Sequence, residues 1–346
     1  MSDPDIPVLR ELGVRLPVLA APMAGGPSTP ELVTAAWNAG SLGFLAAGYK
    51  SASDLEAQAK SVAADGAAFG VNLFVPSTVP VSADDYRRYA RALAAEAAPY
   101  GIDLESVPLT EDDDAWADKL DVVLAARPAV VTTTFGIPAA GDVRALRAAG
   151  ITVGMTVTSA AEAQRAAAAG ADLLVVQGSA AGGHSGTMTP GRLPEQTDLA
   201  GLAGRTRAVT ALPVIAAGGI ATSADVSRVL AAGADAVAVG TVLLRTGESG
   251  ASATHRAALV DPAFDHTVVT RSFTGRPARA LANQWTASHE DEAPLGYPAI
   301  HHLTTALRRA AAAAGDPHRV HLWAGTGWRG AREEPVAQAL GRLADF

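Results

Sequence analysis

One histidine of the chain lies in a loop of small residues, within the segment Gln177-Gly-Ser-Ala-Ala-Gly-Gly-His-Ser-Gly186. The segment follows an apolar run, and its small residues allow the backbone of Gly182 and Gly183 to approach a planar ligand closely. An imidazole with a pKa near neutrality is suited to general-base catalysis. A lone histidine is often structural, but a glycine-rich loop at the end of a predicted strand favours a functional role for His184.

Two further glycine turns follow apolar runs near the middle of the chain. Gly218-Gly219 follows the run 213–217, and Gly240-Thr241 closes the run 236–240. Glycines at such points let backbone N–H groups approach an anion, and a following helix N-terminus favours negative charge. Tight turns alone are the alternative explanation. We interpret the two turns as a site for a phosphate-bearing ligand.

Two apolar segments carry residues that could contact a flat ring. The first ends in Ala21-Pro22-Met23, where proline and methionine would present backbone and a soft side chain; a core methionine at a turn is the alternative. In the second, Asn72 is an amide within an apolar run, so it must find hydrogen-bond partners. A ligand ring with alternating donors and acceptors would supply them.

The elements that must position these residues alternate along the chain. Short apolar runs predict eight strands, separated by Ala-rich helical stretches: 16–21, 42–46, 68–73, 129–134, 151–156, 173–177, 213–217 and 236–240. Strands buried on both faces and joined by crossover helices indicate a parallel sheet. Eight such units favour a (β/α)8 barrel, the TIM-barrel fold, over an open doubly wound sheet. In such a barrel the active site lies at the carboxyl ends of the strands, where the residues above are found.

Turn and cap residues support this division of the chain. Expected helix starts are Ser28-Thr-Pro30, Thr158-Ser159 and Thr222-Ser223. Several helices are expected to end at a glycine: Gly40, Gly150, Gly170 and Gly233.

Two stretches do not fit the repeat. Residues 77–128 are too long for one crossover, and their acidic run 111–114 is interpreted as a helix start or a solvated loop and not as a metal site. Residues 244–315 are interpreted as a small, mostly helical substrate or lid domain over the barrel mouth. The barrel domain then comprises 1–243 and 316–346.

Composition excludes several classes of protein. The 346 residues contain no cysteine and carry a net charge of −8, which argues against Cys-ligated metals, disulfides and nucleic-acid binding. No apolar run is long enough for a membrane span. The segment Met1-Ser-Asp-Pro-Asp-Ile6 is acidic where a signal peptide would be basic, so a cytoplasmic protein is expected.

Two motifs resemble binding sites but lack the necessary context. Gly325-Thr-Gly-Trp-Arg-Gly330 matches G-x-G-x-x-G, yet too few residues follow it for a dinucleotide-binding unit. His301-His302 and His318-x-x-His321 have no acidic motif or thiol beside them, so no metal site is predicted. The sequence has no serine-hydrolase elbow and no Walker loop.

Taken in order, these motifs make the chain similar to the nitronate monooxygenase family, formerly called 2-nitropropane dioxygenases. The resemblance covers nearly the whole chain, and the segments that carry it are Ala21-Pro-Met-Ala-Gly-Gly26, Ser28-Thr-Pro30, the region of Asn72, Phe135-Gly-Ile-Pro138, Ala181-Gly-Gly-His-Ser-Gly186, Ala217-Gly-Gly-Ile220, Gly240-Thr241 and Thr274-Gly-Arg-Pro-Ala-Arg279.

The resemblance implies a non-covalent FMN at the barrel mouth, with no metal. The FMN phosphate would be bound by Gly218, Gly219, Gly240 and Thr241, and the isoalloxazine by Ala21, Pro22, Met23, Asn72, Gln177, Gly182 and Gly183. It also implies oxidation of alkyl nitronates or nitroalkanes by O2, giving a carbonyl compound and nitrite. His184 would deprotonate a nitroalkane or hold its nitro oxygens. A monomer or a homodimer is expected.

Two positions depart from the pattern of bacterial members of the family. Thr134 stands where they carry a second histidine, and Thr305 stands where they carry a lysine. Apart from these departures, three alternative functions are weighed. They are an FMN-dependent NAD(P)H reductase (an enoyl-acyl-carrier-protein or quinone reductase), a phosphate-metabolite isomerase or lyase, and a binding module without catalysis.

Overall fold

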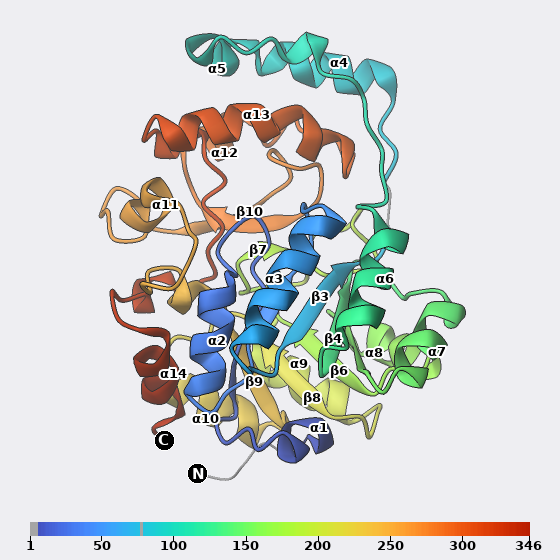
Figure 1. Ribbon diagram of the computed structural model, residues 1–346. Coiled ribbons are helices and arrows are strands. Elements are labelled where there is room, and N and C mark those ends of the chain that lie inside the picture. Colours follow the sequence, from blue (N-terminus) through green and yellow to red (C-terminus); the bar gives the residue numbers. More distant parts are fainter. Residues whose placement is uncertain (1–5, 77–78) are drawn as a thin grey trace.

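The computed structural model describes residues 6–76 and 79–346, and a parallel barrel lies at its centre (Figure 1). The acidic segment 1–5 lies outside the described residues, as do residues 77–78 of the first irregular stretch. The barrel strands are β1 (Val18–Ala20), β2 (Phe44–Ala46), β3 (Gly70–Phe74), β4 (Val130–Thr134), β5 (Thr152–Val157), β6 (Leu173–Gln177), β8 (Val214–Ala217) and β9 (Ala236–Val239). All eight predicted strands are confirmed.

Pairing around the barrel runs β1-β9-β8-β6-β5-β4-β3-β2, with parallel neighbours throughout. A parallel bridge between Ala20 and Gly43 joins the two ends of the sheet. The carboxyl ends of all eight strands therefore meet at one mouth, as the (β/α)8 prediction requires.

In the part of the chain that the structure describes, eight helices surround the barrel, and their apolar faces share one core with the strands. They are α2 (Pro30–Asn38), α3 (Ala52–Ala64), α6 (Trp116–Ala126), α7 (Ala140–Ala148), α8 (Ala160–Ala168), α9 (Leu199–Arg207), α10 (Ser223–Ala231) and α14 (Val336–Ala344). The short α1 (Pro7–Glu11) buries Leu9 in a core cluster with Phe44 and Leu173.

The predicted helix boundaries are confirmed where the sequence marked them. Thr29, Ser159 and Thr222 each accept a hydrogen bond from a backbone N–H of the first helical turn. The glycines expected to end helices all have positive φ: Gly40, Gly150, Gly170 and Gly233.

A second layer lies over the barrel mouth (Figure 1). Its sheet has the order β10-β11-β7, from β10 (Thr267–Thr270), β11 (Ala278–Leu281) and β7 (Gly183–His184). Its helices are α11 (Ala253–Ala258), α12 (Gln284–His289), α13 (Ala299–Ala313), α4 (Ala83–Ala92) and α5 (Ala94–Ala97). Short 3-10 turns are η1 (Ala98–Tyr100), η2 (Leu104–Ser106), η3 (Thr241–Leu243), η4 (Pro317–Arg319) and η5 (Trp328–Gly330).

This layer combines two distant parts of the chain. Tyr86 and Tyr89 of α4 pack in one apolar cluster with Trp285 of α12 and Leu303 of α13. Residues 244–315 contribute two strands as well as helices, so the segment is less uniformly helical than the sequence indicated. Its status as a separate domain stays a prediction.

The acidic run 111–114 is a loop that ties the layers together. Asp112 pairs with His302 Nε2 at 3.0 Å, and Asp114 pairs with the buried Lys119 at 2.7 Å. The Tyr49 backbone N–H donates to the same Asp114 carboxylate. Within the described residues, no group of three or more His, Cys, Asp or Glu side chains is arranged to hold a metal ion. None of the helices in residues 6–76 and 79–346 has both the length and the apolar character of a membrane span.

Candidate active site

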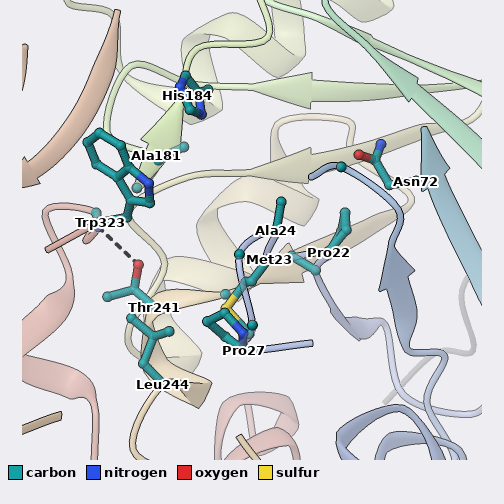
Figure 2. A pocket seen from close by; sticks show the side chains of 18 of the residues that line it. Pro22, Met23, Ala24, Pro27, Asn72, Ala181, His184, Thr241, Leu244 and Trp323 are labelled. Carbon is teal, nitrogen blue, oxygen red and sulfur yellow. Dashed lines mark hydrogen bonds between the residues drawn. The ribbon is translucent and has the colours of Figure 1, made fainter. Parts of the chain in front are cut away.

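A cavity of about 490 Å³ opens at the carboxyl ends of the barrel strands, beneath the second layer. The structure brings every sequence-predicted site residue to its wall: Ala21, Pro22, Met23, Asn72, Gln177, Gly182, Gly183, His184, Gly218, Gly219, Gly240 and Thr241. In Figure 2, His184 and Trp323 lie on one side of the cavity and Asn72 on another, with Pro22 and Met23 between them. Their roles stay predictions, but their convergence on one cavity is a finding.

The two glycine turns need residues without side chains. Gly219 has φ 74°, and a Cβ there would lie 2.8 Å from the Cβ of Ala180. At Gly218, with φ 126°, a Cβ would lie 3.0 Å from the backbone nitrogen of Ala181. The chain must therefore pass close to itself here, which keeps the backbone exposed to any ligand at the turn.

A third glycine segment joins these turns, and the sequence analysis missed its role. The Gly325 N–H donates to Thr241 Oγ1 at 2.9 Å, and the Thr326 N–H donates to the Ala180 carbonyl. Figure 2 shows the Thr241 hydroxyl that accepts the first of these bonds. Gly325 and Gly327 both line the cavity. The sequence analysis rejected this G-x-G-x-x-G pattern as a dinucleotide-binding motif. Its closely spaced glycines could instead have indicated a backbone that packs against the other two turns.

Aromatic rings enclose the imidazole of His184. Ring centroids of Phe135 and Tyr297 each lie 5.8 Å from it, that of Trp323 lies 5.4 Å away and that of Tyr49 lies 6.3 Å away. The sequence marked Phe135 only through the family resemblance. The rings come from four separate loops, so only the folded chain brings them together.

This environment corrects the expected protonation of His184. Burial, reinforced by the positive charges of Arg276 and Arg308, lowers the pKa of His184 from 6.5 to about 3. A pKa near neutrality was expected because the sequence does not show which rings and charges the fold brings next to the imidazole. At physiological pH the residue is neutral and has a lone pair available to accept a proton.

Hydrogen bonds hold the loop that carries His184. Gln177 Nε2 donates to the His184 carbonyl at 3.0 Å, and the Gly186 N–H donates to Gln177 Oε1 at 2.6 Å. The pairing of β7 with β11 places His184 opposite Ala278. Gln177 therefore braces the loop with both ends of its amide group, in addition to lining the cavity.

The side-chain NH2 group of Asn72 donates its hydrogen bonds to protein atoms and not to a ligand. Its Nδ2 donates to the Oγ1 atoms of Thr132 and Thr134, each at 3.0 Å, and Thr134 Oγ1 lies 3.2 Å from Thr156 Oγ1. The expectation that a ligand ring would satisfy this amide was therefore wrong for its NH2 group. Thr134, at the position where relatives carry histidine, is part of this hydroxyl network.

The cavity is also lined by a buried arginine that the sequence did not single out. Arg308 is 4% exposed, and its Nη1 and Nη2 lie 3.1 Å and 3.2 Å from Nδ1 of His321 and His301. Arg308 Nη2 also donates to Thr305 Oγ1 at 3.0 Å. Burial and the charge of Arg308 lower the pKa of both histidines well below 6.5.

No aspartate or glutamate lines the cavity among the described residues, whereas Lys50, Arg308 and Arg309 do. Burial lowers the pKa of Arg308 only to about 10, so its guanidinium is charged at neutral pH. An uncompensated buried cation favours a negatively charged ligand. The cavity can therefore bind an anion, and the neutral imidazole of His184 on its wall can accept a proton.

An α/β barrel with glycine turns after two adjacent strands and a histidine at its mouth is typical of barrel enzymes that bind a phosphate-bearing ligand. The sequence matches the nitronate monooxygenase family over residues 7–345, and the chain belongs to that family. The family assignment and the TIM-barrel fold inferred from sequence are confirmed, and the protein is an enzyme, an oxidoreductase.

Individual relatives agree with this assignment. A probable nitronate monooxygenase of Bacillus subtilis is 31% identical over 97% of each chain, and one of Staphylococcus aureus is 33% identical over 96% of this chain and 94% of the relative. A solved nitroalkane oxidase from Streptomyces ansochromogenes is 43% identical, with a TM-score of 0.91 over 97% of each chain. FabK from Thermotoga maritima is 26% identical, with a TM-score of 0.75 over 98% of this chain and 94% of that one.

Proposed function

We propose that this enzyme binds FMN and oxidises alkyl nitronates with O2, giving a carbonyl compound and nitrite. Each pair of nitronates would consume one O2 and release two carbonyl compounds and two nitrite ions. A neutral nitroalkane would enter the same reaction after losing the proton on its α-carbon. The nitroalkane oxidase relative supports a nitro substrate.

The cavity fits the proposed cofactor. At Gly218, Gly219 and Gly325 the backbone is packed too closely to leave room for a side chain. Such exposed backbone N–H groups are suited to binding a phosphate. The Gly182-Gly183 backbone and the Pro22-Met23 turn line the same cavity and would contact the ring system. When bound, a flavin supplies the electron acceptor that oxidises the substrate and passes the electrons to oxygen.

One observation carries the choice of substrate: the cavity wall has a buried, charged Arg308 and no acidic side chain among the described residues. A nitronate is an anion, and a nitroalkane becomes one when its proton leaves. In both cases Arg308 stabilises the charge, and His184 would take the proton of the neutral substrate. The low pKa of His184 makes its imidazolium costly in the empty cavity, but a nitronate formed beside it supplies the opposite charge.

Anaerobic stopped-flow mixing tests this function directly. The purified protein is mixed separately with propionate 3-nitronate, ethyl nitronate, NADH and NADPH, and bleaching of the flavin absorbance is followed. We expect the nitronates to bleach it and the nicotinamides to react negligibly. Rapid bleaching by NADH or NADPH alone would contradict the proposal and favour an NAD(P)H reductase. A protein that binds no flavin would contradict both functions.

A further inference from the structure

The side chain of Thr274 contacts the candidate catalytic histidine from the second layer. Thr274 Oγ1 lies 2.8 Å from His184 Nε2, and the same hydroxyl donates to the Arg276 carbonyl at 3.3 Å. Thr274 is 1% exposed, so bulk water does not replace either contact. The threonine lies in the turn just before strand β11, and β11 pairs with the two residues of β7.

A hydroxyl has a single proton to donate. If that proton goes to the Arg276 carbonyl, Thr274 Oγ1 must accept from His184, so the imidazole carries its proton on Nε2. This arrangement satisfies the hydroxyl, the ring N–H and a carbonyl inside the protein, whereas the reverse arrangement leaves the carbonyl without this donor. His184 Nδ1 has no hydrogen-bond partner among the described residues, and the residue lines the cavity.

We propose that Thr274 is a positioning residue that holds His184 in the tautomer protonated on Nε2, so that Nδ1 is the atom that accepts the substrate proton. On proton transfer, the C–H bond at the nitroalkane α-carbon breaks, and its electron pair stays on the substrate as the nitronate. The proton forms a new N–H bond at Nδ1. The tautomer itself is a property of the chain; only its catalytic consequence rests on the proposed function.

The neighbouring arginine keeps the turn in place. Arg276 is fully buried, and its guanidinium carbon lies 3.9 Å from the centroid of the Phe135 ring. Its side chain donates to the carbonyls of Ser185 and Thr187, which follow His184. In addition, the Ser185 N–H donates to the Pro277 carbonyl at 2.8 Å. These contacts with Ser185 and Thr187 hold the chain directly after His184 against the turn that carries Thr274.

The test compares Thr274→Val, which removes the hydroxyl at constant shape, with Thr274→Ser, which keeps it. Thr246→Val is the matched control, because its buried hydroxyl also donates to a backbone carbonyl, that of Leu243, but does not line the cavity. Long-range ¹H–¹⁵N correlation spectra of the histidine-labelled holoenzyme report which ring nitrogen is protonated. The His184 signals are assigned by their loss in His184→Asn.

We expect the wild type, Thr274→Ser and Thr246→Val to show the proton of His184 on Nε2, and Thr274→Val to lose this preference. For a neutral nitroalkane, kcat should fall about tenfold in Thr274→Val and recover in Thr274→Ser, while turnover of the matching nitronate changes less than about twofold. A wild-type spectrum with the proton on Nδ1 overturns the inference even if the valine variant does not fold. So does a Thr274→Ser variant that behaves like Thr274→Val. An enzyme inactive on nitro compounds would contradict the proposed function and leave the spectra to decide the tautomer.

Discussion

Arg308 Nη2 lies 3.2 Å from Nδ1 of His301, and the same guanidinium contacts Nδ1 of His321 at 3.1 Å. A guanidinium only donates hydrogen bonds, so both Nδ1 atoms accept, and each neutral imidazole carries its proton on Nε2. Both histidines line the cavity. One buried cation therefore orients two N–H donors and adds its own charge to the wall where we place the substrate.

We expect Arg308→Met to weaken binding of nitronates. Loss of the buried charge should raise KM for propionate 3-nitronate by about 10- to 100-fold, the usual worth of a hydrogen bond to a charged group. Flavin content should be retained, because the glycine turns lie elsewhere on the wall. Steady-state oxygen consumption at varied nitronate concentration measures the effect.

The control for this variant is Arg91→Gln, which removes an exposed charge from α4 outside the cavity. It should leave KM unchanged at ordinary ionic strength, since exposed charges at a distance are screened. An equal rise in KM in both variants would show that net charge, and not the buried guanidinium, determines binding. Unchanged KM in Arg308→Met would remove the arginine from substrate binding.

Acid should destabilise the fold through four histidines whose pKa values the folded chain lowers. The pKa is lowered to about 3 at His184 and to about 4 at His255, mainly by burial, and it is well below 6.5 at His301 and His321. Below pH 6.5 the unfolded chain binds protons at these sites and the native state does not. The free energy of unfolding therefore falls as the pH drops from 6.5 toward 4, by up to about 1.4 kcal/mol per histidine and pH unit.

Urea denaturation at pH 7.5, 6.5 and 5.5 measures this dependence. His255→Gln removes one of the four groups without touching His184, so its stability should fall less steeply between pH 6.5 and 5.5. A free energy of unfolding that is constant over this range in the wild type would show that these histidines are protonated in the native state.

The glycine turns give a separate test of cofactor binding. A Cβ at Gly240 would make only an ordinary contact, 3.4 Å to the Met23 side chain, whereas one at Gly219 would collide with Ala180 at a φ of 74°. We expect Gly240→Ala to fold normally but to lose flavin, and Gly219→Ala to lose both flavin and thermal stability. The ratio of flavin to protein absorbance and the Tm distinguish these effects. Gly341→Ala, in open space on α14, is the control and should retain flavin. Full flavin occupancy in Gly240→Ala would move the phosphate away from this turn.

The barrel could be predicted from sequence because its signals are local. Each strand is a short apolar run, and each crossover helix begins at a residue such as Thr222 or ends at a glycine such as Gly233. Once the eight units are recognised, the rule that barrel active sites lie at strand carboxyl ends selects His184 and Gly219 without further information.

The second layer could not be predicted in the same way. Arg308 belongs to the amphipathic helix α13, and His321 lies in an irregular segment. Nothing near either residue in sequence indicates that both share a cavity with His184. Burial lowers the pKa of His184, and the rings packed around it include Trp323 and Tyr49, which come from distant parts of the chain. Such desolvation is a property of tertiary packing, so residue type and spacing do not reveal it.

His184→Asn tests the residue at the centre of the proposed chemistry. Proton abstraction is needed only for a neutral nitroalkane, so its turnover should fall by about 10²–10⁴-fold, the usual worth of general-base catalysis. Turnover of the matching nitronate should fall much less, and flavin should stay bound. Oxygen consumption with nitroethane and with ethyl nitronate gives the two rates.

The pH profile separates a base from a hydrogen-bonding residue. Because burial and two arginines hold the pKa of His184 at about 3, the wild-type rate with nitroethane should show no rising limb near pH 6.5. A limb at that pH would mean that the imidazole is solvated in the working enzyme, contrary to its aromatic enclosure. Equal losses on both substrates in His184→Asn would show that the imidazole orients the nitro group and takes no proton. Full activity on both would exclude His184 from the reaction, because neither proton transfer nor orientation could then depend on its ring.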